Sequence, residues 1–316
     1  MIQIEGLTKR YGERTAISNL TFHANKGEIV GFLGPNGAGK TTTMRILTGY
    51  MPPSEGRGRV AGFDLLTESL EVRRRVGYLP ENVPLYPEMT VVQYLDFMAE
   101  LRQIPNRQDR VDEVMEQVRI DQRAESYIGN LSKGLRQRVG LGQALLHQPE
   151  VLIMDEPMDG FDPQEQIEVK KLIRTIGQTQ TVMLSTHILT HAQELCDRVI
   201  IIAGGRIVAE DTPERLSAQI AGSGRLHLQV EGDGAGLPEA LRQVAGVTEV
   251  RGTDGHYEIE TAPGADNRAR IAQTVVAGGW PLLELHRDKA TLEQIFIELT
   301  KSEQAQAAEA AEAAEA

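Results

Sequence analysis

The feature that most restricts the fold of this chain is a glycine-rich loop that follows a short apolar run. Residues 28–33 form a mainly apolar and partly β-branched run, as in a strand buried on both faces of a sheet. Residues 34–42 then match the pattern G-x-x-x-x-G-K-[ST], whose backbone N–H groups wrap phosphates at the start of the next helix. A glycine-rich turn without a ligand would explain the glycines but not the adjacent Lys40 and Thr41. The predicted phosphate-binding residues are Gly34, Pro35, Asn36, Gly37, Ala38, Gly39, Lys40, Thr41 and Thr42.

A second apolar run ends in two carboxylates. Residues 151–154 read VLIM and lead directly into Asp155 and Glu156. Ligands of open α/β sheets bind at the carboxyl ends of the strands, where these acids would lie. In isolation the pair is equally well explained as a solvated strand end, but its place downstream of a phosphate loop favours chemistry. We predict that Asp155 holds Mg²⁺ together with the Thr41 hydroxyl, and that Glu156 polarises an attacking water as general base.

The order of strand-like and helix-like segments predicts an α/β domain over residues 1–220. Further buried strands are expected at residues 181–185 and 199–202. Within residues 82–150 apolar side chains recur at helical spacing, and Thr90 is a candidate N-cap. This stretch is therefore expected to be a helical insertion in the α/β domain.

A smaller domain is expected after a candidate linker at residues 222–224. Residues 225–300 alternate short strands and helices in a βαββαβ-like order, which predicts an α+β accessory domain. Its last helix is expected at residues 291–300. Residues 301–316 are rich in Ala and Glu and lack an apolar face, so we expect this tail to be disordered.

Composition narrows the possible partners. The net charge of -12 lacks the basic footprint of a nucleic-acid-binding protein, so no nucleic acid partner is expected. The single cysteine, Cys196, cannot form an internal disulfide, which suits a reducing cytoplasm. No apolar run approaches the roughly 18–20 residues needed to cross a bilayer. If the chain serves transport, another chain must supply the pore.

Residues 131–138, which read LSKGLRQR, make a family resemblance specific. Ser132 is a good N-cap, Gly134 permits close backbone approach, and the following helix would direct its positive end at an anion. A helix cap without a ligand is the simpler explanation of this segment alone. Together with the phosphate loop and the acid pair, however, the segment resembles the signature motif of ABC ATPases, a class of P-loop NTPases. The resemblance implies that the anion is the γ-phosphate of ATP held by the opposite subunit.

The resemblance also assigns single residues. Tyr11, in the segment TKRYG, matches the aromatic residue that stacks on adenine. His187, in LSTH, matches the histidine that contacts the γ-phosphate, and Asp162, in GFDP, matches the aspartate that couples the two sites of the dimer. Simpler explanations are a surface tyrosine, a structural histidine and an N-cap before Pro163, and the cap is compatible with the coupling role.

Two residues depart from the family pattern. Glu81, in GYLPE, stands where glutamine is common, and we expect it to act as a metal ligand there. An ionised glutamate only accepts hydrogen bonds and brings another negative charge to Mg²⁺. Met158 stands where a small polar residue is usual, and the sequence gives no physical reason for it. The run Arg73–Arg75 is either a solvated face or a patch that anchors a partner's cytoplasmic helix.

The resemblance covers residues 1–218. Within the family, the chain looks most like ATPase subunits of ABC-2-type exporters, including gliding-motility-type subunits. It implies an ATP hydrolase that uses ATP and Mg²⁺, a homodimer closed around ATP, and a separately encoded integral-membrane permease. The chain would then be cytoplasmic and peripheral on the inner face of the cell membrane. The transported substrate is not indicated, because specificity in such systems belongs largely to the permease.

Two other classes remain open. One is a soluble ABC ATPase that acts on ribosomes or DNA, which the single cassette, the acidic balance and the lack of a coiled-coil insertion disfavour. The other is a regulatory module that uses ATP only as a dimerisation signal, which the intact Glu156 and His187 disfavour. Turnover of ATP would separate the regulatory module from the transporter subunit.

Overall fold

The computed structural model describes residues 1–220, 224–262 and 267–287. This part of the chain forms two compact units that divide between Pro213 and Glu214, and each unit is described by itself. The helix α8 (Pro213–Ile220) lies at the division. None of the helices in these ranges is long and apolar enough to cross a membrane.

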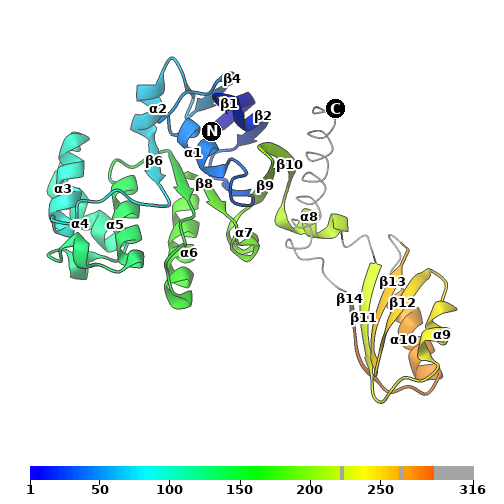
Figure 1. Ribbon diagram of the computed structural model, residues 1–316. Coiled ribbons are helices and arrows are strands. Elements are labelled where there is room, and N and C mark those ends of the chain that lie inside the picture. Colours follow the sequence, from blue (N-terminus) through cyan, green and yellow to red (C-terminus); the bar gives the residue numbers. More distant parts are fainter. Residues whose placement is uncertain (221–223, 263–266, 288–316) are drawn as a thin grey trace. The chain divides into compact units, whose positions relative to one another are not determined.

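A six-stranded sheet supports the first unit (Figure 1), with strands in the order β10-β9-β3-β8-β7-β6. Neighbours are parallel except β10, which runs antiparallel along β9 at one edge. Every residue of β3 and β7 is buried, as expected of strands covered on both faces. All four apolar runs predicted as strands belong to this sheet, which confirms the predicted fold class. Its strands are β3 (Ile29–Leu33), β6 (Val76–Leu79), β7 (Val151–Asp155), β8 (Thr181–Thr186), β9 (Arg198–Ala203) and β10 (Arg206–Asp211).

Helices connect these strands along the chain. The helix α6 starts at a capping box, in which the Asp162 carboxylate accepts the Glu165 N–H at 2.8 Å and the Glu165 carboxylate accepts the Asp162 N–H at 3.2 Å. Pro163 at the first helical position already has the backbone angle that the helix needs. The helices of this region are α1 (Lys40–Leu47) after β3, α6 (Pro163–Gly177) after β7, α7 (Leu189–Leu195) after β8, and α2 (Ser69–Arg75) before β6.

A second, antiparallel sheet in the first unit was not expected from the sequence. It consists of β1 (Ile2–Tyr11), β2 (Arg14–Ala24), β4 (Glu55–Val60) and β5 (Phe63–Asp64), in the order β2-β1-β4-β5. In β1 the side chains of Ile2 and Ile4 are buried and their neighbours are exposed, the alternation of a sheet with one covered face. Both residues belong to the same apolar cluster as Phe32 of the parallel sheet, so the two sheets share one core.

The helical insertion contains α3 (Val91–Leu101), α4 (Arg107–Gln117) and α5 (Lys133–Leu145), with short 3₁₀ helices at Asp121–Arg123 and Ile128–Asn130. Thr90 is the N-cap of α3, as predicted. Its hydroxyl accepts the Gln93 N–H at 3.4 Å, and the Gln93 amide oxygen accepts the Thr90 N–H at 3.0 Å.

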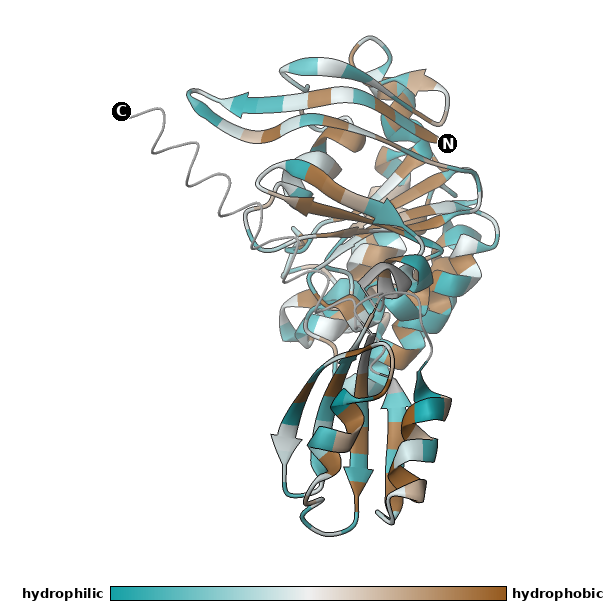
Figure 2. Ribbon diagram, turned by 90° about the vertical axis from the view of Figure 1, so that its right-hand side faces the viewer, coloured by the Kyte–Doolittle hydropathy of each residue, from teal (hydrophilic) through white to brown (hydrophobic). Residues whose placement is uncertain are grey.

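The second unit has the predicted βαββαβ order. Its sheet order, β12-β13-β11-β14, with all neighbours antiparallel, is that of a split βαβ fold. Apolar and polar residues alternate along its strands (Figure 2), and Leu226, Leu228 and Val230 enter the core. The partly buried Trp280 packs against this core. The predicted helix at residues 291–300 and the tail at 301–316 lie outside the described residues. The elements are β11 (Gly224–Val230), α9 (Leu237–Arg242), β12 (Val247–Thr253), β13 (His256–Thr261), α10 (Arg268–Ala277) and β14 (Leu282–Arg287).

A largely buried imidazole joins the helical insertion to the parallel sheet. His147, just after α5, lies with Nε2 3.1 Å from the carbonyl oxygen of Val76 in β6. Burial, and then the positive charge of Arg102, lowers the pKa of His147 from 6.5 to about 4. The folded chain therefore holds this side chain neutral at pH values where an unfolded chain would protonate it.

We predict that His147 makes stability depend on pH between 6.5 and 4. Because its folded pKa lies below its unfolded value, the unfolded state binds more protons in this window. The contribution of the neutral imidazole to the free energy of unfolding is fully present above pH 6.5. It is lost as the pH falls through 4, and the free energy of unfolding falls by up to about 1.4 kcal/mol per pH unit in this window. Urea unfolding followed by circular dichroism at pH 7.5 and 5.0 should show a smaller acid destabilisation for His147→Gln. Equal losses in variant and wild type would contradict the assignment.

Candidate functional site

The predicted phosphate loop joins the end of β3 to the start of α1. Gly39 caps α1 with a left-handed φ of 108°, and a Cβ there would lie 2.4 Å from Ile17 Cγ2. Glycine is therefore required where the loop passes over β2. Lys40, at the first position of α1, has little exposed surface, and its ammonium donates to the carbonyl oxygens of Gly34 at 2.7 Å and Pro35 at 3.3 Å. The loop thus folds around its own lysine.

The two predicted acids lie at the carboxyl end of β7. Asp155 is buried, whereas Glu156 is the first residue beyond the strand and has a left-handed φ of 49°. The Glu156 carboxylate lies 3.7 Å from Lys40 Nζ and 3.0 Å from His187 Nδ1. His187 follows the end of β8 and is half exposed. The structure therefore brings the predicted lysine, general base and histidine into direct contact.

One cavity of about 640 Å³ adjoins the loop, the acids and the histidine. Gly34 and Ala38 belong to the loop without lining the cavity. Tyr11, on the antiparallel sheet, reaches it from outside the parallel sheet, with its phenol donating to Met51 Sδ at 3.2 Å. The predicted site residues that line this cavity are Tyr11, Pro35, Asn36, Gly37, Gly39, Lys40, Thr41, Thr42, Glu81, Asp155, Glu156 and His187.

The donors in the cavity fit Mg²⁺. The Asp155 Oδ2 atom is buried and has no hydrogen-bond partner among the described residues, so a cation or its water would satisfy it. The Thr41 hydroxyl and the Glu81 carboxylate belong to residues that line the same cavity. No group of three or more His, Cys, Asp or Glu side chains in the described ranges is arranged as a metal site. Mg²⁺ commonly takes one or two carboxylates, waters and substrate phosphates, so the donor set suits this ion when a nucleotide is bound.

Three predicted residues lie away from this cavity. Ser132 is the N-cap of α5, where its hydroxyl accepts the Leu135 N–H at 3.2 Å. A Cβ on Gly134 would lie 2.9 Å from the Phe161 ring, so the start of α5 packs closely against the loop before α6. Asp162 caps α6, so the predicted cap is confirmed. Within one chain these residues form a second surface that does not contribute to the cavity.

The structure adds residues that the sequence analysis did not select. Arg14, Ala16 and Asp159 also line the cavity. Asp159 forms an ion pair with Lys133 at 2.6 Å, which ties the loop after the acids to the start of α5. Asp159 lies three residues beyond Glu156, but no spacing rule points to it. Arg14 lines the cavity only because β2 folds back beside Tyr11, and this contact between strands has no signal in the local sequence.

The two departures from the family pattern have different surroundings. The Glu81 side chain is exposed, and its backbone oxygen accepts from Gln137 Nε2 at 2.8 Å, which anchors the residue to α5. Met158 is buried, which accounts for an apolar residue at that position.

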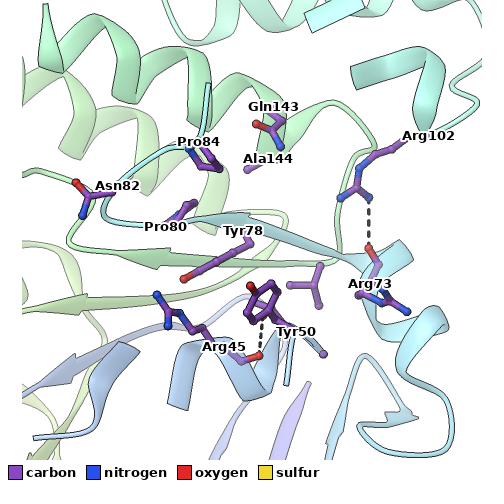
Figure 3. A pocket seen from close by; sticks show the side chains of 13 residues that line it. Arg45, Tyr50, Arg73, Tyr78, Pro80, Asn82, Pro84, Arg102, Gln143 and Ala144 are labelled. Carbon is purple, nitrogen blue, oxygen red and sulfur yellow. Dashed lines mark hydrogen bonds between the residues drawn. The ribbon is translucent and has the colours of Figure 1, made fainter. Parts of the chain in front are cut away.

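A second cavity, of about 650 Å³, lies between the sheets and the helical insertion (Figure 3) and shares no lining residue with the first. We call it the groove. Arg45 lines it from α1, Tyr50 from the turn after α1, Arg73 from α2, and Arg102 and Gln143 from the insertion. Arg102 donates to the Arg73 carbonyl oxygen at 3.3 Å across it, and Tyr50 is 73% exposed. The groove is therefore basic and partly aromatic.

Comparisons with known proteins agree with this geometry. A family model described as "ABC transporter" matches residues 17–159. The chain is 32% identical over 307 residues to the linearmycin resistance ATP-binding protein of Bacillus subtilis (strain 168), covering 95% of this chain and 98% of that protein. It is 33% identical over 305 residues to a daunorubicin resistance ATP-binding protein of Streptomyces coeruleorubidus, covering 95% of each.

One further relative and one solved structure are also similar to this chain. The Nod factor export ATP-binding protein I of Paraburkholderia xenovorans (strain LB400) is 35% identical over 306 residues, with 96% of this chain and 97% of that protein covered. A solved structure described as the ATP binding subunit of an ABC transporter superposes with a TM-score of 0.64 at 29% identity. It covers 70% of this chain and 93% of that one.

Lys40→Met should remove nucleotide binding while leaving the fold intact. The substitution keeps the length of the side chain but removes the charge, and hydrogen bonds to charged groups contribute about 1.5–3 kcal/mol. We therefore expect at least about tenfold weaker ATP binding by isothermal titration calorimetry. Unchanged affinity, in a variant whose circular dichroism matches wild type, would exclude the phosphate-loop assignment.

Proposed function

The chain belongs to the ATP-binding proteins of ABC transporters and is an ATPase of that class, and we propose that it powers an exporter through a separate membrane permease. The observation that carries the ATP-hydrolysing part of the proposal is the convergence of Lys40, Asp155, Glu156 and His187 on one cavity beside the phosphate loop. A Gly-rich turn with unrelated acids would not place a base and a histidine together there.

The proposed chemistry is attack of water on the γ-phosphate of ATP, giving ADP and phosphate. Glu156 takes the proton from the water as general base. His187 lies 3.0 Å from the Glu156 carboxylate, orients that carboxylate and contacts the γ-phosphate. The backbone of residues 34–42 and the Lys40 ammonium hold the phosphates. Mg²⁺, held by Thr41, Asp155 and Glu81, would neutralise charge on the phosphate oxygens. Tyr11 stacks on the adenine.

We propose that the catalytic unit is a homodimer. Ser132 and Gly134 lie at the start of α5, outside the cavity of their own chain, yet a helix N-terminus is a suitable anion site. A second copy would place them against the γ-phosphate, with Asp162 linking the two sites. Hydrolysis then removes contacts between the copies, and ATP drives closure only through its higher affinity for the closed state.

The groove is proposed as the docking site of the permease. It lies apart from the ATP cavity, is lined by Arg45, Arg73 and Arg102, and exposes Tyr50. Aromatic and arginine side chains are enriched where partners bind. In the run Arg73–Arg75 only Arg73 lines the groove, and Arg74 and Arg75 pair with Glu71 at 2.5 and 2.7 Å. The proposed anchoring patch is thus one arginine of the three.

Export is proposed from the names of the relatives, two of which are resistance proteins and one an export protein. The matches extend over 95–96% of this chain, so they include the second unit as well as the ATP-binding unit. The alternative is a soluble ABC ATPase on a non-transport machine. Recovery of a polytopic membrane protein with this chain separates the two.

Glu156→Gln should bind ATP, accumulate as a closed dimer and lose turnover. The amide keeps the size of the side chain but cannot take a proton from water, and general-base catalysis contributes about 10²–10⁴-fold. We expect phosphate release to fall at least about a hundredfold, with an ATP-dependent dimer on size-exclusion chromatography. Hydrolysis at the wild-type rate would remove Glu156 from the mechanism.

Tyr50→Glu should release the permease and leave basal ATPase activity unchanged. A carboxylate at the mouth of the groove replaces an exposed aromatic anchor, and truncated anchors cost about 2 kcal/mol or more. After mild-detergent extraction with ATP, tagged Glu156→Gln chain should recover a polytopic membrane protein, and adding Tyr50→Glu should lower recovery about tenfold. Leu66→Glu, also at an exposed apolar residue but outside the groove lining, is the control. Equal recovery with all three chains would exclude the groove as the docking site.

A further inference from the structure

Ser185 is a buried polar side chain at a central position of the parallel sheet. It lies near the end of β8, between β3, which leads to the phosphate loop, and β7, which delivers the acids. In the sheet register Ser185 is directly opposite Asp155. A hydroxyl in this apolar strand needs hydrogen-bond partners, because an unpaired buried polar group is costly.

The Ser185 hydroxyl has two partners, one on each predicted acid. It donates a short hydrogen bond to Asp155 Oδ1. It also accepts the backbone N–H of Glu156 at 3.1 Å, and the Ser185 carbonyl oxygen lies 3.2 Å from the same N–H. A hydroxyl carries one donor and two acceptor lone pairs, so one side chain can serve both neighbours at once.

The bond to Asp155 determines which carboxylate oxygen remains available. Oδ1 is held by Ser185, and a hydrogen bond to an ionised acceptor is among the stronger ones. Oδ2 is buried without a partner among the described residues. The serine therefore fixes the rotation of the carboxylate and leaves a single oxygen for the cation.

The bond to Glu156 acts on the backbone. Glu156 has a left-handed φ of 49°, an unfavourable backbone conformation for a residue other than glycine, which persists only where the surroundings hold it. The two Ser185 oxygens bind the N–H of this residue, so they help to hold the turn that directs the chain away from β7. The same turn determines where the Glu156 carboxylate meets His187.

We propose that Ser185 is a positioning residue that couples the metal-binding carboxylate of Asp155 to the backbone of the general base Glu156. Its proton fixes Asp155 and its lone pair fixes Glu156, so the cation and the attacking water are held in one arrangement. The inference rests on the proposed hydrolysis at Glu156. In the proposed chemistry Ser185 touches neither ATP nor the attacking water. It acts only through Asp155 and Glu156.

The alternative is that Ser185 only satisfies a buried carboxylate and so contributes to folding alone. Thr181, also buried in β8, allows the two to be separated. Its hydroxyl likewise makes two hydrogen bonds, donating to the Asn25 carbonyl oxygen at 3.0 Å and accepting the Gly27 N–H at 3.1 Å. Thr181 begins the strand and Ser185 lies one residue before its end, so Thr181→Val removes an equivalent pair of bonds away from the acids.

The test is a Mg²⁺ titration of full-length wild type, Ser185→Ala, Ser185→Thr and Thr181→Val, with ATPase activity as the first readout. Loss of groups that orient a metal ligand typically costs about 10–100-fold in metal affinity or activity. For Ser185→Ala we expect half-saturation at about tenfold more Mg²⁺ and a kcat lowered 10–100-fold. The KM for ATP at saturating Mg²⁺ should change by no more than about twofold. Ser185→Thr keeps the hydroxyl and should restore most of the loss, whereas Thr181→Val should match wild type.

A binding readout removes the dependence on turnover. In the Glu156→Gln background, Ser185→Ala should shift the Mg²⁺ dependence of ATP binding to about tenfold higher concentration. Should Ser185→Ala fail to fold, Ser185→Cys, with a weak donor of similar size, is the second variant, and the same shift is expected. Unchanged Mg²⁺ dependence, or an equal change in Thr181→Val, would overturn the positioning role and leave the proposed ATPase intact. Absence of Mg²⁺-dependent turnover in wild type would overturn both.

Discussion

The side-by-side order of β3, β8 and β7 in one parallel sheet is the constraint from which the site follows. Parallel neighbours end at the same edge, so the phosphate loop after β3, the histidine after β8 and the acids after β7 meet without long side chains or mobile loops. Strand spacing is fixed at about 4.8 Å by the hydrogen bonds of the sheet. The distances among Lys40, Glu156 and His187 therefore depend on backbone hydrogen bonds as much as on the side chains.

The parts of this architecture that the sequence predicts are those with a local signal. Buried parallel strands appear as short apolar runs, and the phosphate loop and acid pair stand directly after two of them. The N-caps Thr90 and Asp162 could also be predicted from the sequence, because a capping box depends on two residues three positions apart.

What the sequence did not predict depends on contacts between distant segments. The antiparallel sheet of β1, β2, β4 and β5 is assembled from strands separated by helix α1, and its alternation is interrupted by irregular register in β1. Arg14 and Asp159 reach the cavity beside the phosphate loop only through tertiary folding. Ser185 stands one residue before Thr186 in an ordinary strand sequence, and its contact with Asp155 arises from strand register alone.

The Lys40 ammonium and the Glu156 carboxylate already have partners within the chain. Lys40 donates to two carbonyl oxygens of its own loop, and the Glu156 carboxylate lies between that ammonium and His187. In the proposed binding of ATP, phosphate oxygens would replace these carbonyl oxygens as acceptors for Lys40, which is an exchange of partners. The net gain per contact is smaller than the gross strength of a charged hydrogen bond, because an existing bond is given up.

The cap of α5 has a consequence of a different kind. The Ser132 hydroxyl uses a lone pair to accept the Leu135 N–H and so keeps its proton for another acceptor. The atom that starts a helix within one chain is thereby also able to bind an anion presented by another. In the proposed dimer, the same oxygen atom would stabilise the start of α5 and contact the partner's nucleotide, so its removal would weaken both the helix start and the dimer contact.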